Sequence, residues 1–257
     1  MQINIARPLK KFVPHLIRAR DENLNEADTV DRIEEVLKGV LGYTTEEITK
    51  ESQIKGKFVD IAIKLNGVVR LLIEVKRAGV KLRDRHIEQA EGYAAKGNVR
   101  WVLLTNGVMW NLYHLTFEEG IESEHAFIVD LSSNSIEEAA EDLGILHRKS
   151  IMKGEHEKFW QRRLALSPES IAKVLFAENV LRFIRKEIRK REEILIDIED
   201  IAKELFQTFS PTAQGRIGAV KIYKSKHKRK AKDKRALEAS PIRPPSIPGS
   251  ISNQKDG

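Results

Sequence analysis

The amino-acid sequence predicts an α/β sandwich, in which a central mixed β-sheet is flanked by helices. Apolar residues recur at helical spacing over residues 28–41 and then switch to the period of two that strands show. Two Asn-Gly pairs, Asn66-Gly67 and Asn106-Gly107, each lie between β-branched-rich runs and indicate hairpins. The order of helix, strands, helix and strands is typical of helices packed on a mixed sheet.

Each element follows from a local pattern. A basic helix is expected over residues 3–20, although Pro8 and Pro14 should interrupt it. The helix over residues 28–41 has Asn25 or Asp28 as its cap. The remaining patterns predict strands over 58–65, 68–75, 99–105, 108–115 and 127–131, and helices over 84–95 and 135–143.

The chain divides into three expected regions. Residues 1–145 carry the α/β pattern, and residues 146–210 are helical, with Ser167-Pro168-Glu169 as a clear helix start. This helical region could bind DNA, mediate oligomerisation or pack as a small bundle on the first region. Residues 211–257 are basic and contain several Pro and Ser residues, which predicts a disordered tail.

The net charge of +7 comes from that tail. Residues 211–257 hold 12 Lys/Arg and 3 Asp/Glu, which leaves 33 basic and 35 acidic residues in the first 210. A basic tail can raise the affinity for nucleic acid through phosphate contacts and counterion release. The charge therefore says little about the α/β region itself.

Composition also limits the chemistry. There is no cysteine, so disulfides, thiolate metal sites and a cysteine nucleophile are excluded. The chain opens with no secretory leader pattern, and no apolar run approaches the length of a membrane span. We therefore expect a protein of the cytoplasm.

The first hairpin holds two acids inside apolar strands. Asp60 is followed 14 positions later by Glu74, and Lys76 stands two residues beyond. A carboxylate in such a strand costs desolvation free energy unless a metal or a cation offsets it. Two carboxylates brought together can bind Mg²⁺ through oxygen ligands, and Lys76 can orient a water molecule or stabilise developing charge. The alternative is an edge hairpin with solvent-facing charges, in which Glu74 pairs with Lys76 or Lys64.

The register of this hairpin decides between the two. A two-residue turn at Asn66-Gly67 would place Asp60 opposite Ile73, so that Glu74 points to the other face and the metal site fails. A three-residue loop would pair Asp60 with Leu72 and return Glu74 to the same face. We therefore expect an odd-length loop or a β-bulge.

These residues also fall into a familiar order. Asn25-Glu26, Asp60, Glu74-Val75-Lys76, Gln89-Ala90-Glu91-Gly92-Tyr93 and Leu104-Thr105-Asn106-Gly107 succeed one another over residues 24–131. The sequence resembles the N-terminal nuclease domain of type I restriction enzyme R subunits and its stand-alone relatives. The resemblance implies a restriction-endonuclease-like fold of the PD-(D/E)xK superfamily.

The resemblance also implies an Mg²⁺- or Mn²⁺-dependent endonuclease that hydrolyses DNA in restriction and defence. Asp60, Glu74 and Lys76 match the catalytic motif, and Glu26 matches the acid that helps to organise metal and water. The expected metal ligands are Asp60, Glu74 and the backbone carbonyl of Val75, with Glu26 as a further candidate. Gln89 and Tyr93 match the element that supports the site and positions DNA.

Simpler interpretations stay open for several residues. Glu26 could be an acid that favours a helix N-terminus, and Gln89 and Tyr93 could be a solvent-facing amide and a packed aromatic. Three further aromatic residues in strand patterns are expected in the core, and His86 is expected at the surface. These three are Trp101, Trp110 and Tyr113.

The sequence departs from full R subunits because it has no phosphate-loop motif for a nucleotide and no room for a helicase motor. We expect DNA as a partner, with restriction-modification or helicase subunits or a second copy of the chain as further candidates. The alternative function is a catalytically inactive module that binds DNA or a partner subunit. RNA as the substrate also stays open, because carboxylate chemistry does not distinguish the sugar.

Overall fold

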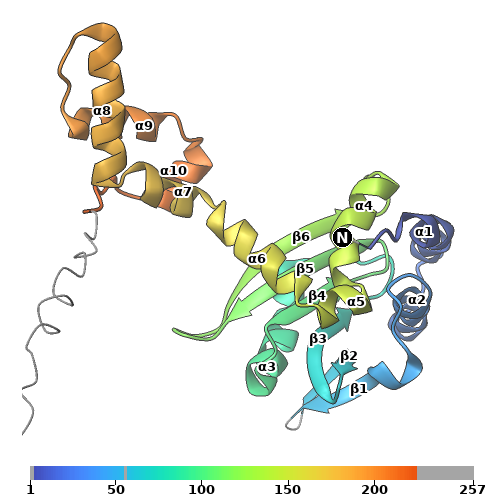
Figure 1. Ribbon diagram of the computed structural model, residues 1–257. Helices are drawn as coiled ribbons and strands as arrows, with labels where there is room; N and C mark the ends of the chain where they lie inside the picture. Colours follow the sequence, from blue (N-terminus) through green and yellow to red (C-terminus); the bar gives the residue numbers. More distant parts are fainter. Residues whose placement is uncertain (1–2, 55–56, 225–257) are drawn as a thin grey trace, which may run out of the picture. The chain divides into compact units, whose positions relative to one another are not determined.

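A computed structural model describes residues 3–54 and 57–224 (Figure 1). The chain forms two compact units, Met1–Ile171 and Ala172–Gly257, which are described separately below. The division falls inside the region, residues 146–210, in which the sequence predicts only helices. From residue 148 onward that region consists of helices joined by connecting segments.

The first unit is built on a six-stranded mixed sheet in the order β1-β2-β3-β4-β5-β6. All neighbours are antiparallel except β3 and β4, which are parallel and are connected through helix α3 (Glu88–Gly97). The strands are β1 (Ile48–Ile54), β2 (Lys57–Leu65), β3 (Val68–Val75), β4 (Trp101–Thr105), β5 (Met109–Thr116) and β6 (Glu122–Asp130). The expected α/β class with a central mixed sheet is confirmed.

Helices cover both faces of the sheet (Figure 1). One hydrophobic core forms under α3, and we call it the α3-side core. A larger core forms on the opposite face. The helices that contribute to this larger core are α1 (Ala6–Asp21), α2 (Glu26–Gly39), α4 (Ile136–Leu143), α5 (Arg148–Met152) and α6 (Glu155–Ala165).

Helix α1 is continuous, so the expected interruption by its prolines is wrong. Pro8 lies in the first turn, where its missing N–H has no acceptor within the helix. Pro14 lies inside the helix and removes one backbone hydrogen bond. The buried face of the helix offsets this cost, because Leu9, Val13 and Leu16 all pack into the larger core.

The first hairpin turns in two residues. Asn66 and Gly67 both have positive φ angles, 53° and 77°, as a type I′ turn requires, and Leu65 pairs with Val68. The register then shifts, because Lys64 pairs with Val69 whereas Ile63 pairs with Leu71. Arg70 is therefore an extra residue in β3, and the expected bulge is present without the three-residue loop.

This bulge places the two acids on one face of the sheet. Ala62 pairs with Leu72, so the expected pairing of Asp60 with Leu72 is wrong. Continuation of the register places Asp60 directly opposite Glu74 rather than diagonal to it. Ala62 and Leu72 belong to the α3-side core, so both carboxylates lie on the face that α3 covers.

Two strands differ from the sequence-based expectation. Strand β1 pairs antiparallel with β2 and was not predicted, because its sequence Ile48–Ile54 is rich in polar residues. Strand β6 begins at Glu122, earlier than the expected residue 127. The sequence did not predict this early start, because the first residues of the strand are polar and exposed. In both cases the pairing with a neighbouring strand, and not apolar alternation, sets the strand.

The second unit is helical around a small core of Ala172, Phe176, Leu181, Ile201 and Ala202. The helices are α7 (Pro168–Leu175), which spans the division, α8 (Glu178–Glu192), α9 (Ile198–Gln207) and α10 (Pro211–Ile217). Residues 211–217 form α10, so the expected start of the disordered tail at residue 211 is wrong. Ser210 caps this helix and Pro211 begins it. The tail beyond residue 224 lies outside the described residues.

Within the described part of the chain, no helix is long and apolar enough to span a lipid bilayer.

Candidate active site

Glu74 is the most buried of the expected acidic residues. It lies near the end of the central strand β3 and is only 2% exposed. Its Oε1 accepts a hydrogen bond from Lys76 Nζ at 2.6 Å, whereas its Oε2 is buried with no hydrogen-bond partner. Burial, and next to it the charge of Asp60, raises the pKa of Glu74 to about 7, although Lys76 acts in the opposite direction. An acceptor oxygen is thus held inside the protein without a donor.

Asp60 faces this carboxylate from β2 and is partly buried. Its Oδ2 accepts a hydrogen bond from the backbone N–H of Val75 at 2.7 Å. This bond fixes the Asp60 carboxylate against the end of β3. It lies beside Val75, whose backbone carbonyl is an expected metal ligand. The two acids that are 14 positions apart in the sequence therefore lie in one site.

Lys76 completes the group, which we call the acidic site (Asp60, Glu74 and Lys76). Its side chain is 22% exposed, and its Nζ also lies 3.9 Å from Glu26 Oε1. Burial alone would lower the pKa of Lys76, but the hydrogen bond to Glu74 and the charges of all three acids raise it above its usual value. Lys76 therefore carries its positive charge at neutral pH.

Glu26 reaches the acidic site from the first turn of α2. Asn25 caps this helix by accepting a hydrogen bond from Asp28 N–H at 2.9 Å, and the Ala78 N–H donates to the Leu24 carbonyl. These bonds hold the start of α2 beside the segment that follows Lys76. Glu26 itself is half exposed, so it lies at the rim of the site rather than inside it.

The Thr105-Asn106-Gly107 turn supports the backbone around Lys76. The Thr105 carbonyl accepts from the Lys76 N–H at 2.8 Å, and the Asn106 amide donates to the Val80 carbonyl at 2.8 Å. The Asn106 side-chain oxygen also accepts from two backbone N–H groups within its own turn. The sequence predicted a hairpin here, and this turn is also part of the family resemblance. The long-range bonds to residues 76 and 80 have no local sequence signal.

Gln89 and Tyr93 lie one turn apart on α3. Gln89 Nε2 donates to the Tyr93 hydroxyl at 2.7 Å, and Tyr93 is buried in the α3-side core. Gln89 is exposed, as the simpler interpretation expected. A role for this pair in supporting the site or positioning DNA stays a prediction.

The other residues that the sequence singled out lie away from the acidic site or at its edge. Trp101, Trp110 and Tyr113 are buried in the cores, as expected. His86 is partly exposed on the segment before α3. Burial and then the charges of Arg85 and Lys76 lower the pKa of His86. No local sequence pattern links this histidine to Lys76.

The residues present fit a divalent cation. In the described residues, no group of three or more His, Asp or Glu side chains is arranged to hold a metal ion. A site made of two carboxylates and a backbone carbonyl does not need a third such side chain. The unpartnered Oε2 of Glu74 beside the Asp60 charge is the feature that a hard cation would satisfy.

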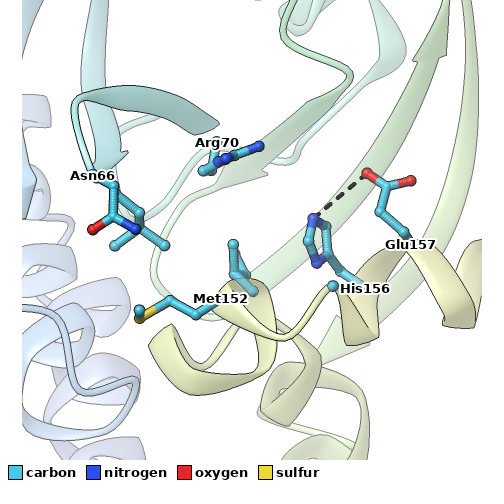
Figure 2. A pocket seen from close by; sticks show the side chains of 8 residues that line it. Asn66, Arg70, Met152, His156 and Glu157 are labelled. Atoms are coloured by element: carbon cyan, nitrogen blue, oxygen red, sulfur yellow. Dashed lines mark ion pairs between the residues drawn. The ribbon is translucent and has the colours of Figure 1, made fainter.

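A separate pocket of about 220 Å³ lies at the turn end of the hairpin and shares no residue with the acidic site. Figure 2 shows Asn66 and Arg70 of the hairpin facing Met152, His156 and Glu157 from the segment of α5 and α6. The bulge that sets the register thus also directs Arg70 to this pocket. His156 is paired with Glu157 at 3.5 Å.

The fold and the acidic site define an α/β domain of the nuclease-like class. Residues 28–131 match the family described as the type I restriction enzyme R protein N terminus. This segment of the chain is therefore similar to the N-terminal domain of that restriction-enzyme family. The match includes all of the acidic site with Gln89 and Tyr93, whereas Glu26 lies just before it and the second unit lies outside it. The chain has no significant match among curated proteins or solved structures.

Proposed function

We propose that this protein is an Mg²⁺- or Mn²⁺-dependent DNA endonuclease of the restriction type. The observation that carries the proposal is the buried Glu74 carboxylate, which has one oxygen bonded to Lys76 and the other without a partner. A carboxylate kept in this state costs folding free energy, because burial disfavours its charge. A functional ligand site is a physical reason for such a residue.

Asp60, Glu74 and the Val75 carbonyl would hold the cation, with Glu26 at the rim. A divalent cation bound there supplies Lewis-acid polarisation of a phosphodiester and makes a water molecule a better nucleophile at neutral pH. Lys76 carries a positive charge within reach of Glu74 and can stabilise the negative charge that develops on the phosphate. Asp60 is held in place by the Val75 N–H, so its carboxylate needs little reorganisation.

The similarity of residues 28–131 to a type I restriction-enzyme family suggests the biological setting. Restriction enzymes of type I act on DNA together with partner subunits, and we propose that this chain works with restriction-modification or helicase subunits. Such partners would supply DNA sequence recognition and any ATP-driven movement. The cytoplasm is the compartment in which such an enzyme meets foreign DNA.

A non-catalytic DNA-binding module is the second candidate. The observation in its favour is the short ion pair between Lys76 and Glu74, which partly neutralises the buried carboxylate without a metal. In this case the fold would retain DNA or partner binding, and the acidic site would be a structural ion pair. Cleavage assays separate the two candidates.

The test is incubation of the purified full chain with plasmid DNA, linear DNA and RNA in Mg²⁺, Mn²⁺ or EDTA. We expect DNA cleavage that requires a divalent cation and that is lost in Asp60→Ala and in Lys76→Ala. Glu88→Gln and Lys96→Ala, which alter charges on α3 outside the acidic site, are the matched controls and should cleave like the wild type.

Cleavage by the Asp60→Ala/Lys76→Ala double variant would exclude the acidic site as the catalytic centre. DNA binding without cleavage by the wild type, unchanged in both variants, would favour the binding module. Cleavage of RNA alone would contradict DNA as the substrate.

A further inference from the structure

Helix α8 has one face in the core of the second unit and one face in solvent. Leu181 is buried, and Ile184 and Ile188 pack against the same core at spacings of three and four residues. The helix is 15 residues long and packs against α9 (Figure 1, orange). Its orientation within the unit is therefore set by apolar burial, which also decides which side chains face outward.

The outward face carries four exposed cations, which we call the basic stripe. They are Arg182, Lys186, Arg189 and Lys190. At 100° per residue these positions fall within one side of the helix, opposite Leu181, Ile184 and Ile188. The stripe rises about 12 Å along the helix axis.

Acidic side chains compensate only part of this charge. Arg182 pairs with Glu178 at 2.6 Å, and Lys190 pairs with Glu187 at 2.9 Å. Within the described part of the chain, Lys186 and Arg189 form no ion pair. Lys186 lies three or four residues from each of the other three cations, a spacing at which like charges repel. A polyanion would relieve this repulsion.

We propose that the basic stripe of α8 binds the phosphate backbone of duplex DNA. Duplex DNA presents phosphate charges every few ångströms, which suits cations spaced along a helix. The choice of DNA as the polyanion rests on the proposed function. The stripe lies outside the family match at residues 28–131, so it is a binding surface that the nuclease-like domain does not provide.

An anionic membrane is the competing ligand, because Phe183 beside the stripe is 63% exposed. Helices that lie in a membrane interface insert a broad apolar face. In α8 the broad apolar face is already packed in the core of the unit, and only Phe183 remains outside. DNA is therefore the better match to this surface.

The experiment measures binding of the full chain to a fluorescent 30-base-pair duplex in EDTA, over a series of salt concentrations. EDTA prevents metal-dependent cleavage, so failure of the nuclease proposal does not affect the result. The variant is Lys186→Ala/Arg189→Ala. The matched control is Lys173→Ala/Lys203→Ala, which removes the same charge from exposed positions on α7 and α9.

We expect the slope of log K against log salt to fall in magnitude by about 1.8 in the stripe variant, because each phosphate contact contributes about 0.9. At 0.1 M salt its Kd should rise by on the order of tenfold or more. The control should keep the wild-type slope and Kd. Equal thermal unfolding temperatures of the three proteins would show that the loss is not due to misfolding.

Three results would overturn the inference. They are an unchanged slope in the stripe variant, an equal loss in the control, and wild-type binding to phosphatidylserine vesicles without binding to DNA. Stripe-dependent DNA binding by a chain that never cleaves would support the inference and contradict the proposed function alone.

Discussion

Lys76 Nζ lies 2.6 Å from one oxygen of Glu74, while the other oxygen of the same carboxylate is buried without a partner. This asymmetry is unusual for a structural ion pair, because buried polar atoms are nearly always hydrogen-bonded. The bulge at Arg70 creates it by turning Glu74 to the face of Asp60. The proposed metal site is therefore a consequence of one extra residue in β3.

The raised pKa of Glu74 predicts how the metal-free protein responds to pH. The folded state holds the proton of this carboxyl up to about pH 7, whereas the unfolded chain releases it near pH 4.5. Between these values the folded state binds more protons, so its stability falls as the pH rises. Over this window the loss should be on the order of 3 kcal/mol.

Urea unfolding in EDTA at several pH values measures this dependence. The variant Glu74→Gln cannot titrate, so its stability should decline less with rising pH than that of the wild type. Glu88→Gln, an exposed change on α3, should follow the wild type. Parallel pH profiles of wild type and Glu74→Gln would show that the carboxyl is not buried in its neutral form.

Asn106→Ala should destabilise the first unit. Asn106 is 5% exposed, and its side chain bonds to the Val80 carbonyl and to two backbone N–H groups. The loss of these bonds, with backbone groups left unpaired, should cost about 2–3 kcal/mol. A fall in the unfolding temperature of about 4–10 °C by calorimetry is expected. The exposed change Gln161→Ala should leave that temperature unchanged, and an equal temperature in both variants would contradict the supporting role of Asn106.

His114 predicts a loss of stability in acid. It stacks on Trp160 at a centroid distance of 4.6 Å, and its Nδ1 is buried without a partner. Burial lowers the pKa of His114, and the charge of Arg100 and of His156 acts in the same direction, whereas Glu157 acts against them. Since the unfolded chain takes up a proton near pH 6.5 and the folded state does so only at lower pH, stability is retained above pH 6.5 and lost below it.

The variant His114→Phe keeps a ring against Trp160 but cannot titrate. Its unfolding temperature should fall less between pH 7.5 and pH 5 than that of the wild type. The exposed substitution His15→Gln is the control and should behave like the wild type. An identical fall in His114→Phe would assign the acid sensitivity to other groups.

The tail provides a prediction that rests on sequence alone. Deletion of residues 211–257 removes 12 Lys/Arg and 3 Asp/Glu, and with them α10. Truncation after residue 224 spares the described helix and is the sharper experiment. It should weaken DNA binding and flatten its salt dependence, while metal binding at the acidic site is unchanged. An unchanged salt slope would show that the tail takes no part in binding.

The sequence predicted the strands of the site because their apolar runs and Asn-Gly turns are local signals. It also predicted that Asp60 and Glu74 could share a face only through an odd loop or a bulge. The bulge is at Arg70, but the residues around Arg70 show no pattern that predicts an extra residue there. Bulge positions follow from pairing and packing across strands, which sequence patterns do not record.

Other features could not be predicted from the sequence for similar reasons. Strand β1 has few apolar residues, and it exists because it pairs with β2. Helix α1 continues through Pro14 because its apolar face is buried in the larger core. The bonds from Thr105 and Asn106 to residues 76 and 80 join segments that are far apart in the chain. Each depends on tertiary contacts rather than on local pattern.

The central claim is that Asp60 and Glu74 form one metal site, and metal binding tests it without any partner subunit or DNA. The measurement is the unfolding temperature of the full chain with Mn²⁺ and with EDTA, for wild type, Asp60→Asn, Glu74→Gln and the control Glu88→Gln. At ten times its Kd the metal should stabilise wild type and control by about 1.4 kcal/mol, or roughly 3–6 °C. It should not stabilise Asp60→Asn or Glu74→Gln at that concentration. An equal Mn²⁺-dependent rise in all four proteins, or none in the wild type, would contradict the account.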